Sequence, residues 1–329
     1  MTPILSAREV RKHFPLKRGF LAREPRRYVH AVDGVNLDII ENETLALVGE
    51  SGSGKSTLGQ LLLGLQEPSE GTVMWSGIPL ASLTKEQRHQ FRRDVQVVFQ
   101  DPYGSLNPRM TVRSIIGRPL KLHRLGSPAE IDREVKRLLE LVGLAPASAY
   151  LDRFPHEFSG GQRQRIAIGR ALALKPRVIV ADEPVSALDV SVRAQILMLL
   201  TTLRREFGLS MLFTTHDLGV VRYIADRVAV MYLGKIVEIA PSDTFFRSTH
   251  HPYSRMLLGS VLSPNPDAKL AARKFGVQGE PPSPINPPSG CRFRTRCPFA
   301  HARCETEEPL LRRIGLHHLS ACHLDQFES

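Results

Sequence analysis

The chain lacks two features that would tie it to a membrane or to an export pathway. No apolar run in its 329 residues approaches the ~18 residues that a bilayer-spanning helix requires. The stretch from Met1 to Phe14 carries Arg8, Glu9, Arg11 and Lys12 where a secretion signal needs apolar residues. We therefore expect no export signal there, and a chain that stays in the cytoplasm.

Cysteine is absent from the first 290 residues. The four cysteines are Cys291, Cys297, Cys304 and Cys322. Disulfides are not expected in a reducing compartment. A body without cysteine and a tail with four instead suggests a local metal or cluster site in that tail.

Acidic residues are outnumbered, and the formal net charge is +11. This balance is compatible with nucleic acid, anionic lipid or anionic ligands as partners. Much of the excess lies in Lys17, Arg18, Arg23, Arg26 and Arg27 near the start, and in Arg292, Arg294, Arg296, Arg303, Arg312 and Arg313 near the end. Solvated surface charge and attraction to a lipid surface both explain these two groups.

The most informative stretch that is present runs from Gly49 to Ser56 and reads Gly-x-x-x-x-Gly-Lys-Ser. An apolar run of strand length, residues 44–48, precedes it, and a helical pattern over 57–63 follows, which is the context of a phosphate-binding loop. Glycines let the backbone N–H groups turn inward around phosphate oxygens. Lys55 can reach the β- and γ-phosphates, and the Ser56 hydroxyl can bind Mg²⁺. The predicted ATP-binding residues of this loop are Gly49, Ser51, Gly52, Ser53, Gly54, Lys55, Ser56 and Thr57.

Three further polar groups follow predicted strands. Asp182 and Glu183 end the apolar strand that begins at residue 177, where a carboxylate can bind Mg²⁺ and its neighbour can activate a water. Gln100 follows a strand over 94–99 and can bind Mg²⁺ or position water. His216 follows a strand over 210–214, at the edge where α/β folds keep their ligands, and could donate to a γ-phosphate.

A second anion site is predicted at Ser159, Gly160, Gly161 and Gln162. Ser159 can cap the helix that follows, and the glycines leave the helix N-terminal amides bare. Upstream of the phosphate loop, Phe14 could stack on a nucleobase, with Tyr28 as a second candidate.

The remaining pattern places strands at 4–14, 35–48 and 71–75. Apolar residues at helical spacing predict a helical block from 111 to 150, with Ile131, Val135 and Leu138 among them. A hairpin is expected across Leu233-Gly234, between strands 228–232 and 235–239, and a single helix over 242–259. Prolines after Leu262 predict a linker with little regular structure.

Taken together, these motifs resemble the ABC ATPase family, in that family's order, over about residues 1–260. The resemblance implies an α/β fold: a P-loop, RecA-like core with an antiparallel β subdomain and an inserted helical subdomain at about 101–158. A Pro-rich linker and a small four-cysteine extension would occupy 261–329. It also implies that Glu183, His216 and Gln100 are catalytic, that Ser56, Gln100 and Asp182 bind Mg²⁺, and that Asp189, in the run Ser186-Ala187-Leu188-Asp189, contacts ATP. Phe158 departs from the family pattern, which usually has Leu.

A narrower resemblance covers the whole length. The loop 101–108, the run 181–193, His251-Pro252-Tyr253 and the proline-cysteine tail look like the peptide and nickel importers, most closely the second ATPase subunit (the F subunit) of dipeptide importers. This implies a bacterial importer for dipeptides or oligopeptides, with a paralogous D subunit as the ATPase partner. Two membrane permeases and a periplasmic peptide-binding protein complete the assembly, which places the chain peripherally on the cytoplasmic face of the inner membrane. The resemblance does not decide the substrate, which is a dipeptide, a longer peptide, a nickel chelate or a peptide-like compound.

Two other functions compete with transport. A nucleic-acid-associated ABC ATPase would suit the positive charge, but it would show tandem cassettes or a long coiled coil, and this chain has neither. A non-catalytic, cluster-dependent regulator is opposed by the intact Glu183 and His216. We therefore predict no nucleic-acid partner.

The tail cysteines are spaced C-x5-C-x6-C-x17-C. Structural zinc usually uses pairs two to four residues apart, whereas the wider spacing suits an iron–sulfur cluster. The subfamily that the chain resembles carries a [4Fe–4S] cluster at such cysteines. Zn²⁺, with His301, His317, His318 or His323 as substitute ligands, and reduced thiols without metal remain the alternatives.

Overall fold

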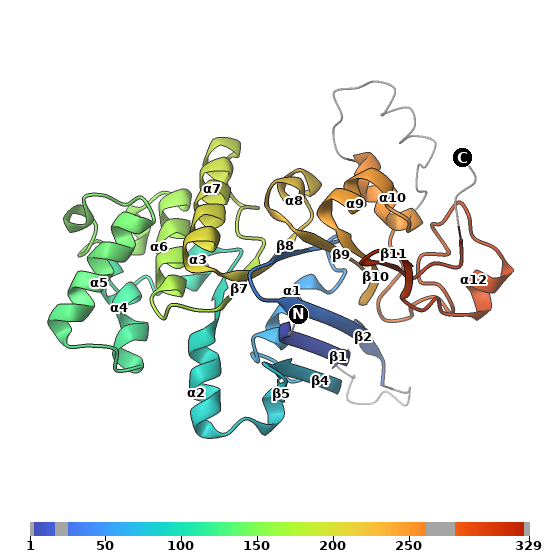
Figure 1. Cartoon of the computed structure of the whole chain (residues 1–329), viewed down its shortest axis with the longest axis horizontal. Coiled ribbons are helices and arrows are strands. Elements are labelled where there is room, and N and C mark those ends of the chain that lie inside the picture. The colour runs from blue at the N-terminus through green and yellow to red at the C-terminus, as the bar shows by residue number, and fades with distance from the viewer. Residues whose placement is uncertain (1–2, 17–25, 261–279, 326–329) are drawn as a thin grey trace. The chain divides into compact units, whose positions relative to one another are not determined.

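The computed structural model describes residues 3–16, 26–260 and 280–325, and these form two compact units. The first unit comprises residues 40–43 and 81–214. The second comprises 3–39, 44–80 and the described residues from 215 onward. Figure 1 labels the elements of both. None of the described helices combines the length and the apolar character that crossing a bilayer would take. Lys17, Arg18, Arg23 and most of the predicted linker lie outside the described residues.

The second unit contains an antiparallel sheet with the strand order β2-β1-β4-β5. Its strands are β1 (Pro3–Pro15), β2 (Tyr28–Ile40), β4 (Glu70–Trp75) and β5 (Ile78–Pro79). In Figure 1 these strands lie side by side below the label α1. Leu5 of β1 faces Trp75 of β4, and both side chains are buried. This sheet is the antiparallel subdomain that the sequence predicted.

The same unit carries five strands of a second sheet in the order β11-β12-β10-β9-β3. Their bounds are β3 (Thr44–Val48), β9 (Arg227–Tyr232), β10 (Lys235–Pro241), β11 (Arg312–Gly315) and β12 (His318–Ser320). Strand β3 is buried throughout and pairs with β9 in parallel. The predicted β9–β10 hairpin is confirmed. Leu233 (φ 42°) and Gly234 (φ 80°) form its two-residue turn, in which both φ values are positive.

The single strand predicted over 35–48 is wrong, because the chain turns inside it. Strand β2 ends at Ile40 and β3 begins at Thr44. Asn42 between them has φ 61°, a left-handed conformation that asparagine tolerates better than most residues and that interrupts an extended strand.

The single helix predicted over 242–259 is also wrong. The chain forms α9 (Ser242–Ser248) and α10 (Pro252–Ser260) instead. Pro252 opens α10, where its missing N–H costs nothing. The buried carboxylate of Glu238 accepts the backbone N–H groups of His250 (2.7 Å) and His251 (3.0 Å), which fixes the chain between the two helices.

Glu238 also binds the Thr249 hydroxyl (2.8 Å) and lies 2.7 Å from Nε2 of His318 in the tail. Burial works to raise the pKa of Glu238, but the hydrogen bonds from His318 and from the 250–251 backbone outweigh it, and its pKa lies below the ordinary value. A buried, ionised carboxylate therefore joins β10, the start of α10 and β12.

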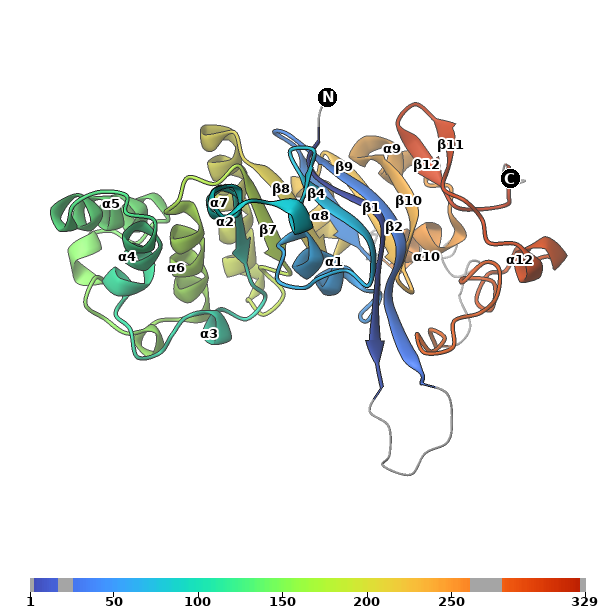
Figure 2. The same ribbon diagram turned by 90° about the horizontal axis from the view of Figure 1, so that it is seen from below.

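The first unit holds three parallel strands in the order β8-β7-β6, with helices around them. The strands are β6 (Val95–Val98), β7 (Val178–Asp182) and β8 (Ser210–Thr215). The helices are α2 (Lys85–Asp94), α3 (Pro102–Ser105), α4 (Val112–Leu122), α5 (Pro128–Leu141), α6 (Gly160–Leu172) and α7 (Val190–Phe207). Figure 2 shows α4, α5 and α6 gathered together in this unit.

Local sequence explains the helical block. Ser127 caps α5 and Pro128 occupies its first position, while the Glu130 carboxylate accepts a hydrogen bond from the Ser127 N–H. The predicted face of Ile131, Val135 and Leu138 is buried. Helix α2, by contrast, was not predicted, although Thr84 and Gln87 form a capping box at its start. Its ten residues are mostly charged, and they carry too few apolar residues to show a helical period.

The described part of the tail is more ordered than predicted. It contributes β11, β12 and α12 (Ala302–Thr306), and β12 pairs with β10. Phe293 is 1% exposed and lies in one core with Tyr232 and Tyr253. The prolines at 281–288 predict little regular structure. The order of the tail could not be predicted from the sequence, because a single apolar anchor such as Phe293 produces no periodic pattern.

Candidate functional site

The phosphate loop is shaped by close backbone approach at two glycines. A Cβ on Gly49 would lie 2.2 Å from the carbonyl oxygen of Met231, and one on Gly54 would lie 2.1 Å from that of Ala31. Any side chain at either position would therefore force the loop away from β2 and β9. The β9–β10 turn also supports the loop, because Gly234 donates its N–H to the Ser53 carbonyl at 2.9 Å.

Lys55 is held inside this loop. Its side chain is 5% exposed, and Nζ donates to the carbonyls of Gly49 (2.8 Å) and Glu50 (2.9 Å). Lys55 also begins α1 (Lys55–Leu62), whose N terminus has no side-chain cap. A helix N terminus with a glycine turn and a buried ammonium is a suitable arrangement for binding phosphates.

The acidic pair and Gln100 come together in the first unit. Nε2 of Gln100 lies 3.3 Å from Oε2 of Glu183, and Asp182 ends β7 next to it. Glu183 has φ 44°, which turns the chain sharply after the strand. Gln100 and the acidic pair therefore lie together beyond the carboxyl ends of the neighbouring parallel strands β6 and β7, while their roles in binding Mg²⁺ and in hydrolysis stay predictions.

Thr214 is a member of this group that the sequence analysis missed. Its hydroxyl donates to Oδ1 of Asp182 (2.6 Å) and accepts the backbone N–H of Glu183 (3.0 Å). The Thr214 carbonyl lies 3.1 Å from that same N–H. Thr214 therefore fixes the carboxylate of Asp182 and the backbone of Glu183. Thr214 ends the predicted strand over 210–214, and the pairing of that strand with the one that ends at Asp182 was the signal that could have revealed it.

The predicted second anion site has the predicted cap. The Ser159 hydroxyl accepts the backbone N–H of Gln162 at the start of α6, and Oε1 of Gln162 accepts the Ser159 N–H. Gly161 is required there, because a Cβ would lie 2.4 Å from Cγ1 of Val192 in α7. The second hydrogen bond of this cap, from the Ser159 N–H to the Gln162 side chain, was not predicted from the sequence.

The remaining predicted residues lie near the ends of strands or helices. Asp189 is exposed and precedes α7. Phe14 is half-buried near the end of β1, with the Lys12 ammonium 5.3 Å from its ring. His216 is exposed and precedes α8 (Leu218–Ile224) in the second unit, which also holds the phosphate loop.

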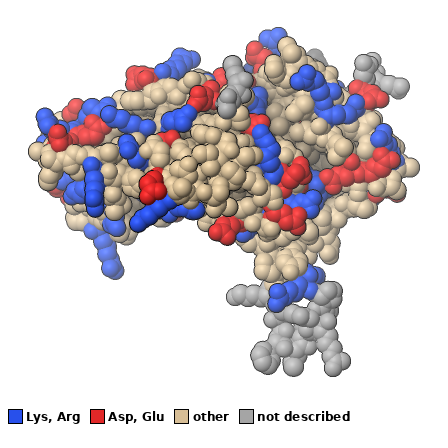
Figure 3. Space-filling view, turned by 60° about the horizontal axis from the view of Figure 1, so that its bottom comes forward, with Lys and Arg blue, Asp and Glu red and all other residues tan. Residues whose placement is uncertain are grey.

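Two of the tail arginines are ion-paired within the fold and have little contact with solvent. Arg292 pairs with Asp33 and donates to the Leu233 carbonyl, and its side chain is 9% exposed. Arg296 pairs with Glu50 of the phosphate loop. On the face in Figure 3, Lys and Arg side chains are interspersed with Asp and Glu.

The four cysteines are free thiols and affect one another. Burial raises the pKa of Cys291 to about 11 and that of Cys297 to about 12, and neighbouring cysteines add to both shifts. The pKa of Cys322 is also raised, chiefly by burial and further by Cys304. Cys304 is buried, and its carbonyl accepts the Cys291 N–H at 2.8 Å. The four cysteines therefore lie near one another in the fold, although Cys291 and Cys322 are 31 positions apart in the sequence.

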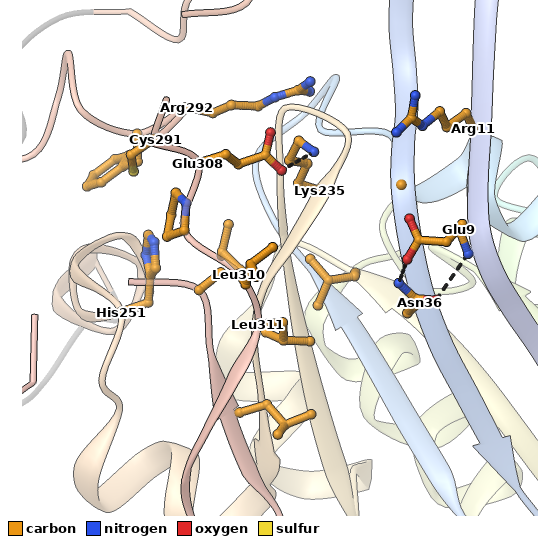
Figure 4. Close-up of a pocket in the computed structure, with 17 residues that line it drawn as sticks. Glu9, Arg11, Asn36, Lys235, His251, Cys291, Arg292, Glu308, Leu310 and Leu311 are labelled. Carbon is orange, nitrogen blue, oxygen red and sulfur yellow. Dashed lines mark hydrogen bonds and ion pairs between the residues drawn. The ribbon is translucent and has the colours of Figure 1, made fainter. Parts of the chain in front are cut away.

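A cavity of about 520 Å³ borders this region. Figure 4 shows Cys291, Arg292 and Glu308 of the tail on one side, with Glu308 joined to Lys235, and Glu9 and Asn36 of the antiparallel sheet on the other. Charges of both signs and the leucines at 310, 311 and 319 line it. One of the four cysteines is thus placed at a cavity wall.

His13, His30 and Asp33 are a compact group whose possible ligand atoms lie within 4.8 Å of one another. Asp33 is ion-paired with Arg292, and Nε of Arg11 lies 3.4 Å from its Oδ1. Burial works to raise the pKa of Asp33, but Arg292, Lys235 and Arg11 together outweigh it, and the pKa lies below the ordinary value. Surrounding cations disfavour a metal ion here, so we interpret the group as an ion-pair cluster.

Comparison with known families gives two matches. Residues 32–186 match the ABC transporter model, and residues 237–304 match the model described as the oligopeptide/dipeptide transporter C-terminal region. The second match begins in β10 and includes the first three cysteines.

Similar proteins match over nearly the whole chain. A putative oligopeptide transport ATP-binding protein, YkfD of Bacillus subtilis (strain 168), is 49% identical, with 98% of this chain and 95% of that protein covered. The oligopeptide transport ATP-binding protein OppF of Escherichia coli (strain K12) is 46% identical over 98% and 96%. Among solved structures, the dimeric post-hydrolysis ATP-binding cassette MJ0796 bound to ADP and Pi is 32% identical, with a TM-score of 0.62, covering 72% of this chain and 98% of that one.

Proposed function

Because the chain belongs to the ATP-binding proteins of ABC transporters, we propose that it powers the uptake of dipeptides or oligopeptides through a pair of membrane permeases. ATP hydrolysis and work with permease subunits follow from the family itself. The peptide substrate is the proposal, and one observation carries it. The C-terminal region over 237–304 matches the oligopeptide/dipeptide transporter model, in a chain whose full-length relatives bear oligopeptide transport names.

Each group of the site has a role in this proposal. The phosphate loop with Lys55 and Ser56 binds the β- and γ-phosphates, and Phe14 stacks on the base. Asp182, Ser56 and Gln100 hold Mg²⁺, which neutralises phosphate charge when bound. Glu183, fixed through Thr214, takes a proton from the attacking water, and His216 contacts the γ-phosphate.

The Ser159–Gln162 turn and Asp189 would act on a partner's nucleotide. A helix end binds only one side of a γ-phosphate, and a phosphate loop binds the other. Two ATPase chains closing head to tail complete both sites, and hydrolysis removes what holds them together. We infer that the partner is the paralogous D subunit, that a periplasmic peptide-binding protein delivers the substrate, and that the chain lies on the cytoplasmic face of the bacterial inner membrane.

Purification of the native complex tests this assembly. Affinity purification of the tagged chain from membranes should recover two permeases, one related ATPase and a peptide-binding protein. Permeases accompanied by a binding protein for nickel chelates, or recovery of nucleic acid in their place, would contradict the peptide proposal.

We infer from the sequence that the loop after Gln100, with Tyr103, Leu106 and Pro108, receives a short cytoplasmic helix of the permease. The structure corrects one of these three residues. Leu106 is 1% exposed, so its predicted part in docking is wrong, because a buried core side chain cannot receive a partner. Tyr103 is 62% exposed, and its ring lies 3.4 Å from the guanidinium carbon of Arg163 in α6. Tyr103 therefore joins the loop after Gln100 to the helix that follows the Ser-Gly-Gly-Gln turn.

Tyr103→Ala should weaken assembly with the permeases by about 30-fold, since a buried interface aromatic commonly contributes ~2 kcal/mol. ATP binding by the chain should stay unchanged. Tyr223→Ala, which removes another exposed tyrosine (56%) from α8, is the matched control. Full assembly and transport by the Tyr103 variant would reduce this loop to an ordinary surface segment.

The proposal extends to a [4Fe–4S] cluster on Cys291, Cys297, Cys304 and Cys322. Their wide spacing and their convergence on one region support it. Four thiolates would hold the irons, and the bound centre would stabilise the loop-rich tail. Zn²⁺ and metal-free thiols remain the alternatives.

Anaerobic purification distinguishes the three. We expect brown protein with broad absorbance near ~400 nm and about four irons per chain. Cys304→Ser should lose the iron and loosen the tail, whereas His317→Ala, at an exposed position between β11 and β12, should keep it. Colourless anaerobic protein with one zinc per chain would favour the zinc alternative.

A further inference from the structure

The C-terminal part of the chain holds the phosphate loop through one residue, Glu50. The guanidinium of Arg296 binds both carboxylate oxygens of Glu50, with Nη1–Oε2 at 2.9 Å and Nη2–Oε1 at 3.0 Å. The Arg296 side chain is 8% exposed and that of Glu50 is 29% exposed. A two-point arginine–carboxylate pair with so little solvent contact fixes both position and orientation.

A second contact holds the backbone of the same residue. The N–H of Glu50 donates to the Tyr253 hydroxyl at 2.8 Å, and Tyr253 is fully buried. Tyr253 ends the His-Pro-Tyr sequence at 251–253, and its own N–H donates to Nδ1 of His251 at 3.1 Å. Burial lowers the pKa of His251 to about 4, so this ring is neutral near pH 7 and can accept that hydrogen bond.

Glu50 in turn holds the phosphate-binding ammonium. Its carbonyl accepts a hydrogen bond from Nζ of Lys55 at 2.9 Å, and it also accepts the Ser53 N–H at 3.2 Å. A displacement of Glu50 would therefore move both the lysine and the turn that surround the phosphates.

The segment that supplies Arg296 is itself fixed to the unit. Residues 291–297 form successive turns, with the N–H groups of Arg294 and Arg296 donating to Cys291 and Phe293. Phe293 packs against the rings of Tyr232 (5.3 Å) and Tyr253 (5.4 Å). The Arg296 guanidinium lies 5.9 Å from the Tyr232 ring. The tail and the loop therefore share one aromatic core.

We propose that Arg296 and Tyr253 are positioning residues for ATP binding, which act on the phosphate loop through Glu50. Neither touches the reacting atoms, so they set the affinity for nucleotide more than the rate of hydrolysis. This inference rests on the proposed ATP-binding role of the loop, and it gives the C-terminal region a part in that role.

The test is the binding of Mg·ATP to the full chain, followed by steady-state hydrolysis by the complex assembled with its permeases and ATPase partner. Arg296→Ala should raise Kd and KM for ATP about tenfold, as expected for loss of a buried charged hydrogen-bond pair. The value of kcat should change by less than about twofold. Arg296→Lys keeps the charge but loses the two-point geometry, so its Kd for ATP should lie between those of the wild type and of Arg296→Ala. Tyr253→Phe removes only the hydroxyl and should raise Kd about threefold.

Two controls separate positioning from general damage. Arg303→Ala removes an exposed tail arginine that pairs with Glu307, and it should leave Kd unchanged. If Arg296 acts through Glu50, the Glu50→Ala and Arg296→Ala effects should not add in the double variant.

Equal Kd values for wild type and Arg296→Ala, or fully additive effects, would overturn the inference. Failure of the wild-type chain to bind Mg·ATP would overturn the inference and the loop assignment together. Wild-type binding without peptide-coupled hydrolysis would contradict only the peptide proposal.

Discussion

Glu183→Gln is expected to bind ATP as the wild type does and to lose nearly all hydrolysis. Glu183 receives a hydrogen bond from Gln100 (3.3 Å), and Thr214 fixes its backbone N–H. Glutamine has the same size, so Mg²⁺ and phosphate contacts remain, but an amide cannot accept the proton of the attacking water. Loss of a positioned general base lowers kcat by about 10²–10⁴-fold.

The measurement is ATP turnover by the assembled complex, with nucleotide affinity recorded in parallel. Glu206→Gln is the matched control, because Glu206 is an exposed glutamate near the end of α7 in the same unit. Turnover by the Glu183 variant at close to the wild-type rate would show that another group acts as the base.

Lys55→Ala should lose nucleotide binding itself. Lys55 is 5% exposed, and its ammonium is held by the Gly49 and Glu50 carbonyls inside the loop. Removing the amine deletes the charge that faces the phosphates and leaves two carbonyls without this donor. Charged hydrogen bonds contribute about 1.5–3 kcal/mol each, so affinity should fall by about 100-fold or more.

Titration with ATP in the presence of Mg²⁺ measures this loss. Arg8→Ala is the control, since Arg8 lies in the same unit, its side chain is 40% exposed, and its guanidinium also donates to a backbone carbonyl, that of Ala7. An unchanged thermal transition would show that the Lys55 variant is folded. Affinity within threefold of the wild type would remove Lys55 from the phosphate site.

The sequence predicted the parts of this fold whose signals are local. The phosphate loop, the capped turn at Ser159 and the β9–β10 hairpin each depend on glycines and caps that act within a few residues. The meeting of Gln100 with Glu183 was predictable because parallel strands end at one edge of a sheet.

The errors arose where distant residues decide the local structure. The break between α9 and α10 depends on Glu238, whose carboxylate reaches residues 250–251 from another element. Arg296 carries no periodic or spacing signal, because its partner Glu50 is 246 positions away, and the partner of Thr214, Asp182, lies on another strand, 32 positions away. Such pairs become visible only once the strands and the tail are placed.

The central claim is that this chain couples ATP hydrolysis to peptide uptake, and one measurement tests it directly. The chain, assembled with its permeases and ATPase partner in lipid vesicles, is supplied with the peptide-binding protein, and ATP turnover is followed with and without peptide. We predict that a dipeptide or short oligopeptide raises turnover and accumulates inside the vesicles, and that Glu183→Gln abolishes both. ATP turnover that is unchanged by peptides but is raised by a nickel chelate, or by nucleic acid, would contradict the account.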